Sequence, residues 1–433
     1  MKTLYKLTAV AFALSVSGCG SIAKGITEAF LDRPAAEDRR LCEIRGAAFP
    51  GLRADLDKQT NTSGGNDRTL KVLMVHGIGE HIPGYSARLS EKLAHQLNLT
   101  VISEGYKEIN LKAPPSVMQT DGENDLGQLR IQRFTNKQRD RELLFYELTW
   151  SDILAPEKEL LAFDDSGTQT SKRATVNRMI KEFFNSHVPD PMIYLGKSKE
   201  KILQAVGQSI CWMVSKDWQG YDDTSNAVCR SLNPVNAEKD DYALITHSLG
   251  SRVVIDSLQR IAALTQKGMD KLSGADQAQF SKTFQALQNK RFPIYMLANQ
   301  LPLLQLGREA PTVSNQIDQY CRADGPNYKN RMFKELNVVA FSDPNDILSY
   351  SLPPGFSDKY IDSRLCPRVV NVAINIAPVV DLLGLGEFAN PATAHNDYEA
   401  DDRVISIIAD GIGMDTSSTL IAERCQWLET IRD

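Results

Sequence analysis

The sequence has no feature that marks a nucleic-acid-binding, metal-binding or nucleotide-binding protein. Its 433 residues carry a formal net charge of −5, whereas a nucleic-acid surface needs clustered Lys and Arg. No spacing of Cys and His is typical of a zinc site, and neither G-x-G-x-x-G nor a Walker pattern occurs. We therefore expect no nucleic-acid partner, no metal and no organic cofactor.

A long hydrophobic run is also lacking, and this decides how the N-terminus is interpreted. The apolar residues 7–16 are too few to span a membrane, which takes about 20 residues. They follow Lys2 and lead through the small residues Ser17 and Gly18 to Cys19. This pattern predicts a secretory signal peptide at residues 1–18.

Residues 16–19, with the sequence Val-Ser-Gly-Cys, resemble the lipobox of bacterial lipoproteins. The resemblance implies that the signal is cleaved before Cys19 and that this cysteine carries acyl chains, which anchor the protein in a membrane. The residue after the cysteine is Gly20 rather than Asp, which resembles the rule that sorts such lipoproteins of Gram-negative bacteria to the outer membrane. We expect a lipid-anchored protein of the bacterial cell envelope that faces the periplasm. The alternative is an ordinary signal peptide with a chance cysteine.

Six further cysteines agree with export, because an even number in an oxidising compartment indicates disulfides. Many pairings are possible, and the proximity of loops along the chain favours one set. The predicted pairs are Cys42–Cys425, Cys211–Cys229 and Cys321–Cys366. The alternative is that some of these residues are buried free thiols.

Short apolar runs alternate with helical patterns along the rest of the chain. Runs typical of buried strands occur at residues 70–75, 143–150, 242–246, 292–298 and 336–341. Their order predicts an α/β fold with a mostly parallel central sheet and helices on both faces. We expect a tether and N-terminal extension at residues 19–68, and an α/β domain at 69–433 with a helical insertion at about 151–235.

A serine stands where one of these strands meets a helix. Ser248 follows the run 242–246 and precedes the helical pattern at 253–262, so a sharp turn would expose its hydroxyl above the sheet. The residues around it, Thr246-His247-Ser248-Leu249-Gly250, match the motif G-x-S-x-G except at the first glycine. A serine hydroxyl needs a base, and the base needs a third group to orient it.

Candidates for the base and the acid follow later in the chain. Of the six histidines, His395 alone lies far beyond Ser248, in a loop between an apolar stretch and a helical pattern. Two acidic residues, Asp343 and Asp346, come directly after the run 336–341. Ahead of Ser248, the run 70–75 ends in His76-Gly77-Ile78-Gly79, where glycines permit backbone N–H groups to turn inward.

Together, residues 70–100 and the stretches around Ser248, Asp346 and His395 resemble the α/β-hydrolase superfamily, in which the nucleophile, the acid and the histidine follow one another in that order. The resemblance implies a triad of Ser248, Asp346 and His395. Asp346 is favoured because two apolar residues follow it, whereas Asp343 precedes a proline and suits a turn. If Asp343 were the acid, Asp346 would be the turn or cap residue.

The same resemblance implies an oxyanion hole formed by two backbone N–H groups. One belongs to Leu249, next after the nucleophile, and the other to Ile78 in the early glycine-containing loop. The insertion at 151–235 resembles the helical caps of lipases. Its apolar residues either line an acyl pocket or, as we favour, form the packing face of the cap.

The expected function is that of a membrane-anchored serine hydrolase that cleaves a carboxylic ester, including a lipid or acylated substrate, through an acyl-enzyme on Ser248. An acyltransferase or a peptidase could use the same triad. A non-catalytic binding or scaffold lipoprotein of the envelope is the alternative from another class.

Overall fold

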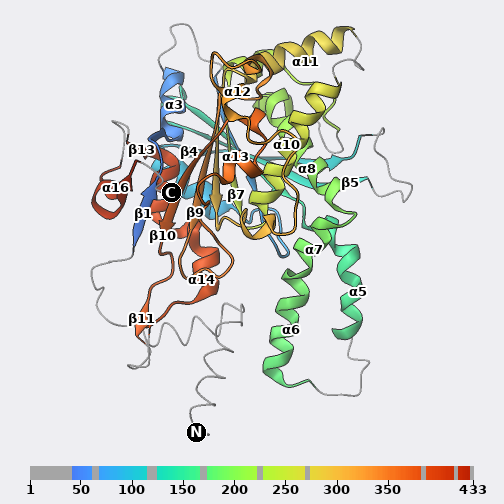
Figure 1. The fold of residues 1–433 in the computed structure, drawn as a ribbon, viewed down its shortest axis with the longest axis vertical. Coiled ribbons are helices and arrows are strands. Elements are labelled where there is room, and N and C mark those ends of the chain that lie inside the picture. The colour runs from blue at the N-terminus through green and yellow to red at the C-terminus, as the bar shows by residue number, and fades with distance from the viewer. Residues whose placement is uncertain are drawn as a thin grey trace.

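A ten-stranded sheet forms the centre of the fold (Figure 1). The computed structural model describes residues 41–60, 68–114, 124–165, 173–221, 228–268, 274–381, 387–413 and 418–429. The strand order is β14-β1-β10-β9-β8-β7-β3-β6-β5-β4. Six neighbouring strands in its centre are parallel: β3 (Leu70–Val75), β6 (Glu142–Thr149), β7 (Asp241–His247), β8 (Arg291–Leu297), β9 (Glu335–Ser342) and β10 (Pro367–Ile374). All five predicted runs lie in this parallel part.

Antiparallel strands extend the sheet at both edges. At one edge β4 (Thr100–Lys112) and β5 (Asp125–Thr135) pair with each other, and β5 pairs with β6. At the other edge β1 (Cys42–Arg45) runs antiparallel to β10, and β14 (Gln426–Leu428) lies beside β1. The predicted extension at 19–68 must therefore be shortened, because β1, β2 (Phe49–Pro50) and α3 (Leu52–Thr60) belong to the α/β unit.

Helices cover both faces of the sheet and give it two hydrophobic cores. Apolar residues of α8 (Lys199–Ser215) and α10 (Gly250–Gly268) fill one core, and those of α3, α4 (Ala87–Gln96) and α15 (Asp402–Asp410) fill the other. In β3, Leu73 and Val75 face the first core while Val72 and Met74 face the second, as the alternation of a strand requires. The predicted α/β class with a mostly parallel sheet is thereby confirmed.

The insertion between β6 and β7 consists of two structurally different parts. Helices α5 (Ala155–Asp165), α6 (Thr175–His187) and α7 (Pro189–Leu195) extend below the sheet in Figure 1. In contrast, α8 packs on the sheet itself, with Trp212 and Met213 buried in the core. These two side chains therefore form a packing face, and the part of 151–235 that stands apart from the sheet ends near residue 195.

Three disulfides join the cysteine pairs that the chain order favoured. Cys42–Cys425 connects β1 to the residue before β14, Cys211–Cys229 closes a loop at the end of α8, and Cys321–Cys366 joins α12 (Ile317–Cys321) to the start of β10. The predicted signal peptide and Cys19 lie outside the described residues. Among the residues that are described, no helix has the length and apolar character of a membrane span.

A buried ion pair fixes the amino-terminal end of β3. The Lys71 ammonium lies 2.7 Å from the Asp240 carboxylate, and both side chains are fully buried. Lys71 Nζ also donates a hydrogen bond to the Lys216 carbonyl, 2.8 Å away, just after α8. Burial raises the pKa of Asp240 above its usual value, and the charge of Lys71 offsets only part of this shift. The pair connects β3 to the chain segments at both ends of the α8–β7 connection.

We expect Lys71→Met to lower the free energy of unfolding by about 3–5 kcal/mol, because it leaves the buried Asp240 carboxylate without a counter-charge and with the Thr69 backbone N–H as its remaining hydrogen-bond donor. The double variant Lys71→Met/Asp240→Asn removes both charges and should lose clearly less stability. Urea unfolding followed by circular dichroism, with the disulfides intact, measures both. Equal losses of unfolding free energy in the single and double variants would show that the unpaired charge of Asp240 is not the cause of the destabilisation.

Candidate active site

The carboxyl ends of the parallel strands meet at one edge of the sheet, and the predicted site residues come together there. Ser248 directly follows β7, and Asp346 lies four residues beyond the end of β9. His395 lies in α14 (Pro391–Asn396), after β10. Because neighbouring parallel strands end at the same edge, three segments far apart in the sequence become neighbours.

The turn between β7 and α10 holds Ser248 in an unusual backbone conformation. Its φ of 53° is in the left-handed region, which non-glycine residues rarely adopt. A Cβ on Gly250 would lie 2.5 Å from the Val75 carbonyl oxygen, so β3 leaves room for glycine alone at this position. Thr246, at the place of the motif's first glycine, is fully buried in the strand. The sharp turn therefore forms without that glycine.

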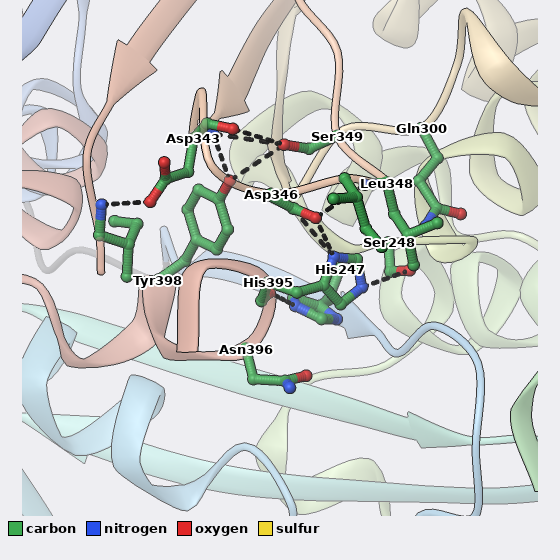
Figure 2. Close-up of polar contacts among 12 residues, drawn as sticks. His247, Ser248, Gln300, Asp343, Asp346, Leu348, Ser349, His395, Asn396 and Tyr398 are labelled. Carbon is green, nitrogen blue, oxygen red and sulfur yellow. Dashed lines mark hydrogen bonds and ion pairs between the residues drawn. The ribbon is translucent and has the colours of Figure 1, made fainter. Parts of the chain in front are cut away.

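A chain of hydrogen bonds connects the three predicted side chains, as Figure 2 shows. His395 Nε2 lies 3.0 Å from Ser248 Oγ, and His395 Nδ1 lies 2.9 and 3.0 Å from the two carboxylate oxygens of Asp346. All three side chains are buried. Burial raises the pKa of Asp346, but the hydrogen bond and charge of His395 outweigh it and hold this pKa below its usual value. Asp346 is thus an ionised acceptor for the imidazole N–H.

Asp343, the alternative acid, has a different set of partners. One carboxylate oxygen accepts hydrogen bonds from the backbone and side chain of Asn345. The other accepts the backbone N–H groups of Ile376 and Ala377, beyond the end of β10. Asp343 therefore forms the turn after β9 and ties it to the next loop, while Asp346 is the residue that contacts His395.

The early glycine-containing loop lies against the nucleophilic serine. A Cβ on Gly77 would be 2.6 Å from Ser248 Cβ, so this backbone passes in direct contact with the serine. Within the described ranges, the backbone N–H groups of Ile78 and Leu249 donate no hydrogen bond. Leu249 is fully buried, and a buried N–H without an acceptor is uncommon. The two residues predicted for an oxyanion hole therefore carry backbone N–H groups that are not engaged, one next to Ser248 in the chain and one in the loop that contacts this serine.

His76 fixes the conformation of this loop. Its Nδ1 lies 2.9 Å from the Gly77 carbonyl, and its Nε2 accepts a hydrogen bond from the Trp150 backbone N–H at 3.0 Å. The rings of His76 and Trp150 stack with their centroids 4.7 Å apart. Burial lowers the pKa of His76 well below its usual value, in keeping with a neutral ring that donates from Nδ1 and accepts at Nε2. His76 is thereby a structural residue of the loop.

The insertion reaches the same loop through a buried carboxylate. Asp190 in α7 accepts the Gly79 backbone N–H at 2.6 Å, and its other oxygen lies 2.7 Å from Lys158 Nζ in α5. The His187 ring also lies against Gly79, since a Cβ added there would be 3.0 Å from His187 Nε2. Helices α5 to α7 are therefore attached to the loop next to Ser248.

Two site residues were not identified from the sequence. His247 Nε2 lies 2.8 Å from the His395 backbone carbonyl, so the residue before the nucleophile holds α14. Gln300 follows β8, and its backbone N–H donates to Ser251 Oγ. Its side chain is almost wholly buried and extends toward Ser248 in Figure 2. The position of His247 directly before the nucleophile could have indicated a role at the site. Gln300 has no such sequence signal, because the order of strands in the sheet alone brings it there.

Comparison of the chain with protein-family models, with curated proteins and with solved structures found no match. Across the described parts of the chain, no three His, Cys, Asp or Glu side chains are grouped so as to hold a metal ion. The arrangement is that of an activated serine hydroxyl, with a base, an acid that orients the base, and adjacent free N–H donors.

We expect Asp346→Asn to slow the reaction of Ser248 with a fluorophosphonate by about 10⁴-fold, because the amide would hold the wrong tautomer of His395. The matched variant Asp343→Asn should react within about tenfold of the wild type. Instead, it should lose about 1–3 kcal/mol of stability through weakened backbone hydrogen bonds. Rates of covalent labelling and urea unfolding provide the two readouts. A reversed order of effects would make Asp343 the acid.

A second expectation concerns acid stability. Burial and the nearby charge of His395 lower the pKa of His247 from 6.5 to about 3. Between these pH values the unfolded chain binds a proton that the folded chain does not, so stability falls as the pH decreases from 6.5 toward 3.

Replacing His247 by Gln keeps a donor for the His395 carbonyl and removes this titration. The unfolding free energy of His247→Gln should therefore depend less steeply on pH in the same window. Urea unfolding at a series of pH values measures the slopes. Equal slopes in the two proteins would mean that His247 does not contribute.

Proposed function

We propose that this protein is a serine hydrolase of the α/β-hydrolase superfamily that cleaves a carboxylic ester. The observation that carries the proposal is the continuous hydrogen-bond chain from Ser248 Oγ through the His395 ring to the Asp346 carboxylate. The order of these residues in the chain, and the left-handed backbone of Ser248 between a strand and a helix, support the same class.

The first half of the proposed reaction forms an acyl-enzyme. Ser248 Oγ attacks the ester carbonyl while His395 Nε2, 3.0 Å away, takes its proton. Asp346 accepts the Nδ1–H and stabilises the imidazolium, which is why an ionised Asp346 suits the role. The backbone N–H groups of Ile78 and Leu249 stabilise the oxyanion of the tetrahedral intermediate. His395 then gives the proton to the departing alcohol.

The second half releases the acyl group. Water takes the place of the alcohol, His395 removes a proton from it, and the hydroxide attacks the acyl carbonyl. Collapse of the second tetrahedral intermediate breaks the bond to Ser248 Oγ, which recovers its proton from His395. A carboxylic acid and the free enzyme are the products. The mechanism uses side chains and backbone groups of this chain throughout.

The location proposed for this activity follows from the N-terminal sequence. Residues 16–19 resemble a lipobox, and three disulfides agree with folding in an oxidising compartment. We propose that Cys19 anchors the enzyme in the bacterial envelope, at the periplasmic side of the outer membrane. A substrate with an acyl chain fits an enzyme held at a membrane.

The test is hydrolysis of p-nitrophenyl esters of increasing acyl length by the chain from Gly20 to Asp433. We expect turnover by the wild type and a loss of about 10⁶-fold in kcat for Ser248→Ala, since a triad acts as a unit. Ser257→Ala, a buried serine on α10 away from the triad, serves as the matched control and should remain active. No turnover and no fluorophosphonate labelling of folded wild type would overturn the hydrolase mechanism.

A further inference from the structure

Large apolar side chains are exposed on the face where the active site lies. We use the name carboxyl-edge face for the surface formed by the segments that lie at the carboxyl ends of the parallel strands. The five most exposed large apolar side chains of the described residues all belong to such segments. They are Leu160, Ile82, Leu306, Ile347 and Met192, exposed by 83%, 78%, 75%, 72% and 68%.

These residues come from separate segments of the carboxyl-edge face. Ile82 follows β3, Leu306 follows β8, and Ile347 is the neighbour of Asp346 after β9. Leu160 and Met192 lie on α5 and α7, which the Lys158–Asp190 ion pair and the Asp190–Gly79 hydrogen bond attach to the loop after β3. Helices α5 and α6 extend from the lower side of the molecule in Figure 1, and α14, which carries His395, lies on this same side.

Exposure of several large apolar side chains on one face of a domain marks a surface that contacts another apolar body. The described chain also begins at this face. Leu41 is half exposed, and its carbonyl accepts a hydrogen bond from Asn375, directly after the carboxyl end of β10. Residues 20–40, between Leu41 and the proposed anchor Cys19, span at most about 75 Å when fully extended. A chain anchored at Cys19 therefore joins the domain on the carboxyl-edge face.

We propose that the carboxyl-edge face rests on the lipid bilayer, with Leu160, Met192 and Ile82 inserted among the lipids. In this orientation Ser248 takes an ester lipid directly from the membrane surface. The substrate class rests on the proposed hydrolase function, whereas the docking of the face does not. Apolar insertion is insensitive to salt, unlike attraction to anionic head groups, which salt screens.

The experiment uses the chain from Gly20 to Asp433, which contains every described residue and lacks the predicted anchor. It is sedimented with vesicles of phosphatidylethanolamine and phosphatidylglycerol at low and high salt. We expect binding that persists at high salt, and a partition coefficient at least about tenfold lower for Leu160→Ser/Met192→Ser. The matched control is Val235→Ser/Leu264→Ser, two exposed apolar residues outside the face, which should bind like the wild type.

A parallel assay with a short water-soluble ester separates this proposal from the hydrolase mechanism. Both double variants should hydrolyse it like the wild type, and Ser248→Ala should bind vesicles normally without hydrolysis. Vesicle binding without any ester turnover would retain the docking and overturn the hydrolase. The bilayer would be overturned as the occupant of this face if the wild type did not bind vesicles or lost its binding at high salt. It would also be overturned if Leu160→Ser/Met192→Ser bound as well as the wild type, or if the protein self-associated through this face in the absence of vesicles.

Discussion

The close contact of three backbone segments at Ser248 is the constraint on which the site depends. Gly250 at the start of α10 leaves no room between itself and the carbonyls at the end of β3, and Gly77 lies directly against the serine. Larger residues at either position would separate strand, helix and loop. The strained φ of Ser248 is maintained because β7 lies between β3 and β8, which hold it through the sheet. From this fixed point, the ends of β9 and β10 are near enough for Asp346 and His395 to complete the hydrogen-bond chain.

The parallel centre of the fold could be predicted because its strands are continuous apolar runs, buried on both faces. The remaining strands of the sheet, which include the central strand β10, could not be predicted in this way. In β5, buried and partly exposed residues alternate irregularly, and in β10 the run is interrupted by Asn371. That asparagine is buried because it exchanges two hydrogen bonds with the backbone of Leu352, a partner that no local pattern indicates. Tertiary hydrogen bonds thus compensate for a polar residue where sequence reasoning finds an interruption.

Motif order and chemistry were enough to select Ser248, His395 and Asp346, which the structure brings together. They also favoured Asp346 over Asp343, although both follow the same strand within four residues. The contributions of His247 and Gln300 depend on which segments the sheet makes neighbours. The attachment of α7 through Asp190 similarly depends on a contact between residues more than a hundred positions apart. Such long-range contacts have no signature in local composition or periodicity.

The Cys42–Cys425 disulfide gives the domain the topology of a closed ring. It joins residues 383 positions apart, next to strands that already lie side by side in the sheet. In the chain-entropy description, closing so long a loop disfavours the unfolded state by about 6 kcal/mol. The disulfide keeps β1 and β14 covalently linked even if the chain between them is cleaved once. A single cut in an exposed loop between Cys42 and Cys425 would leave the two fragments covalently joined by this disulfide. A circular permutant with new ends in such a loop would keep the same strands as neighbours in the sheet.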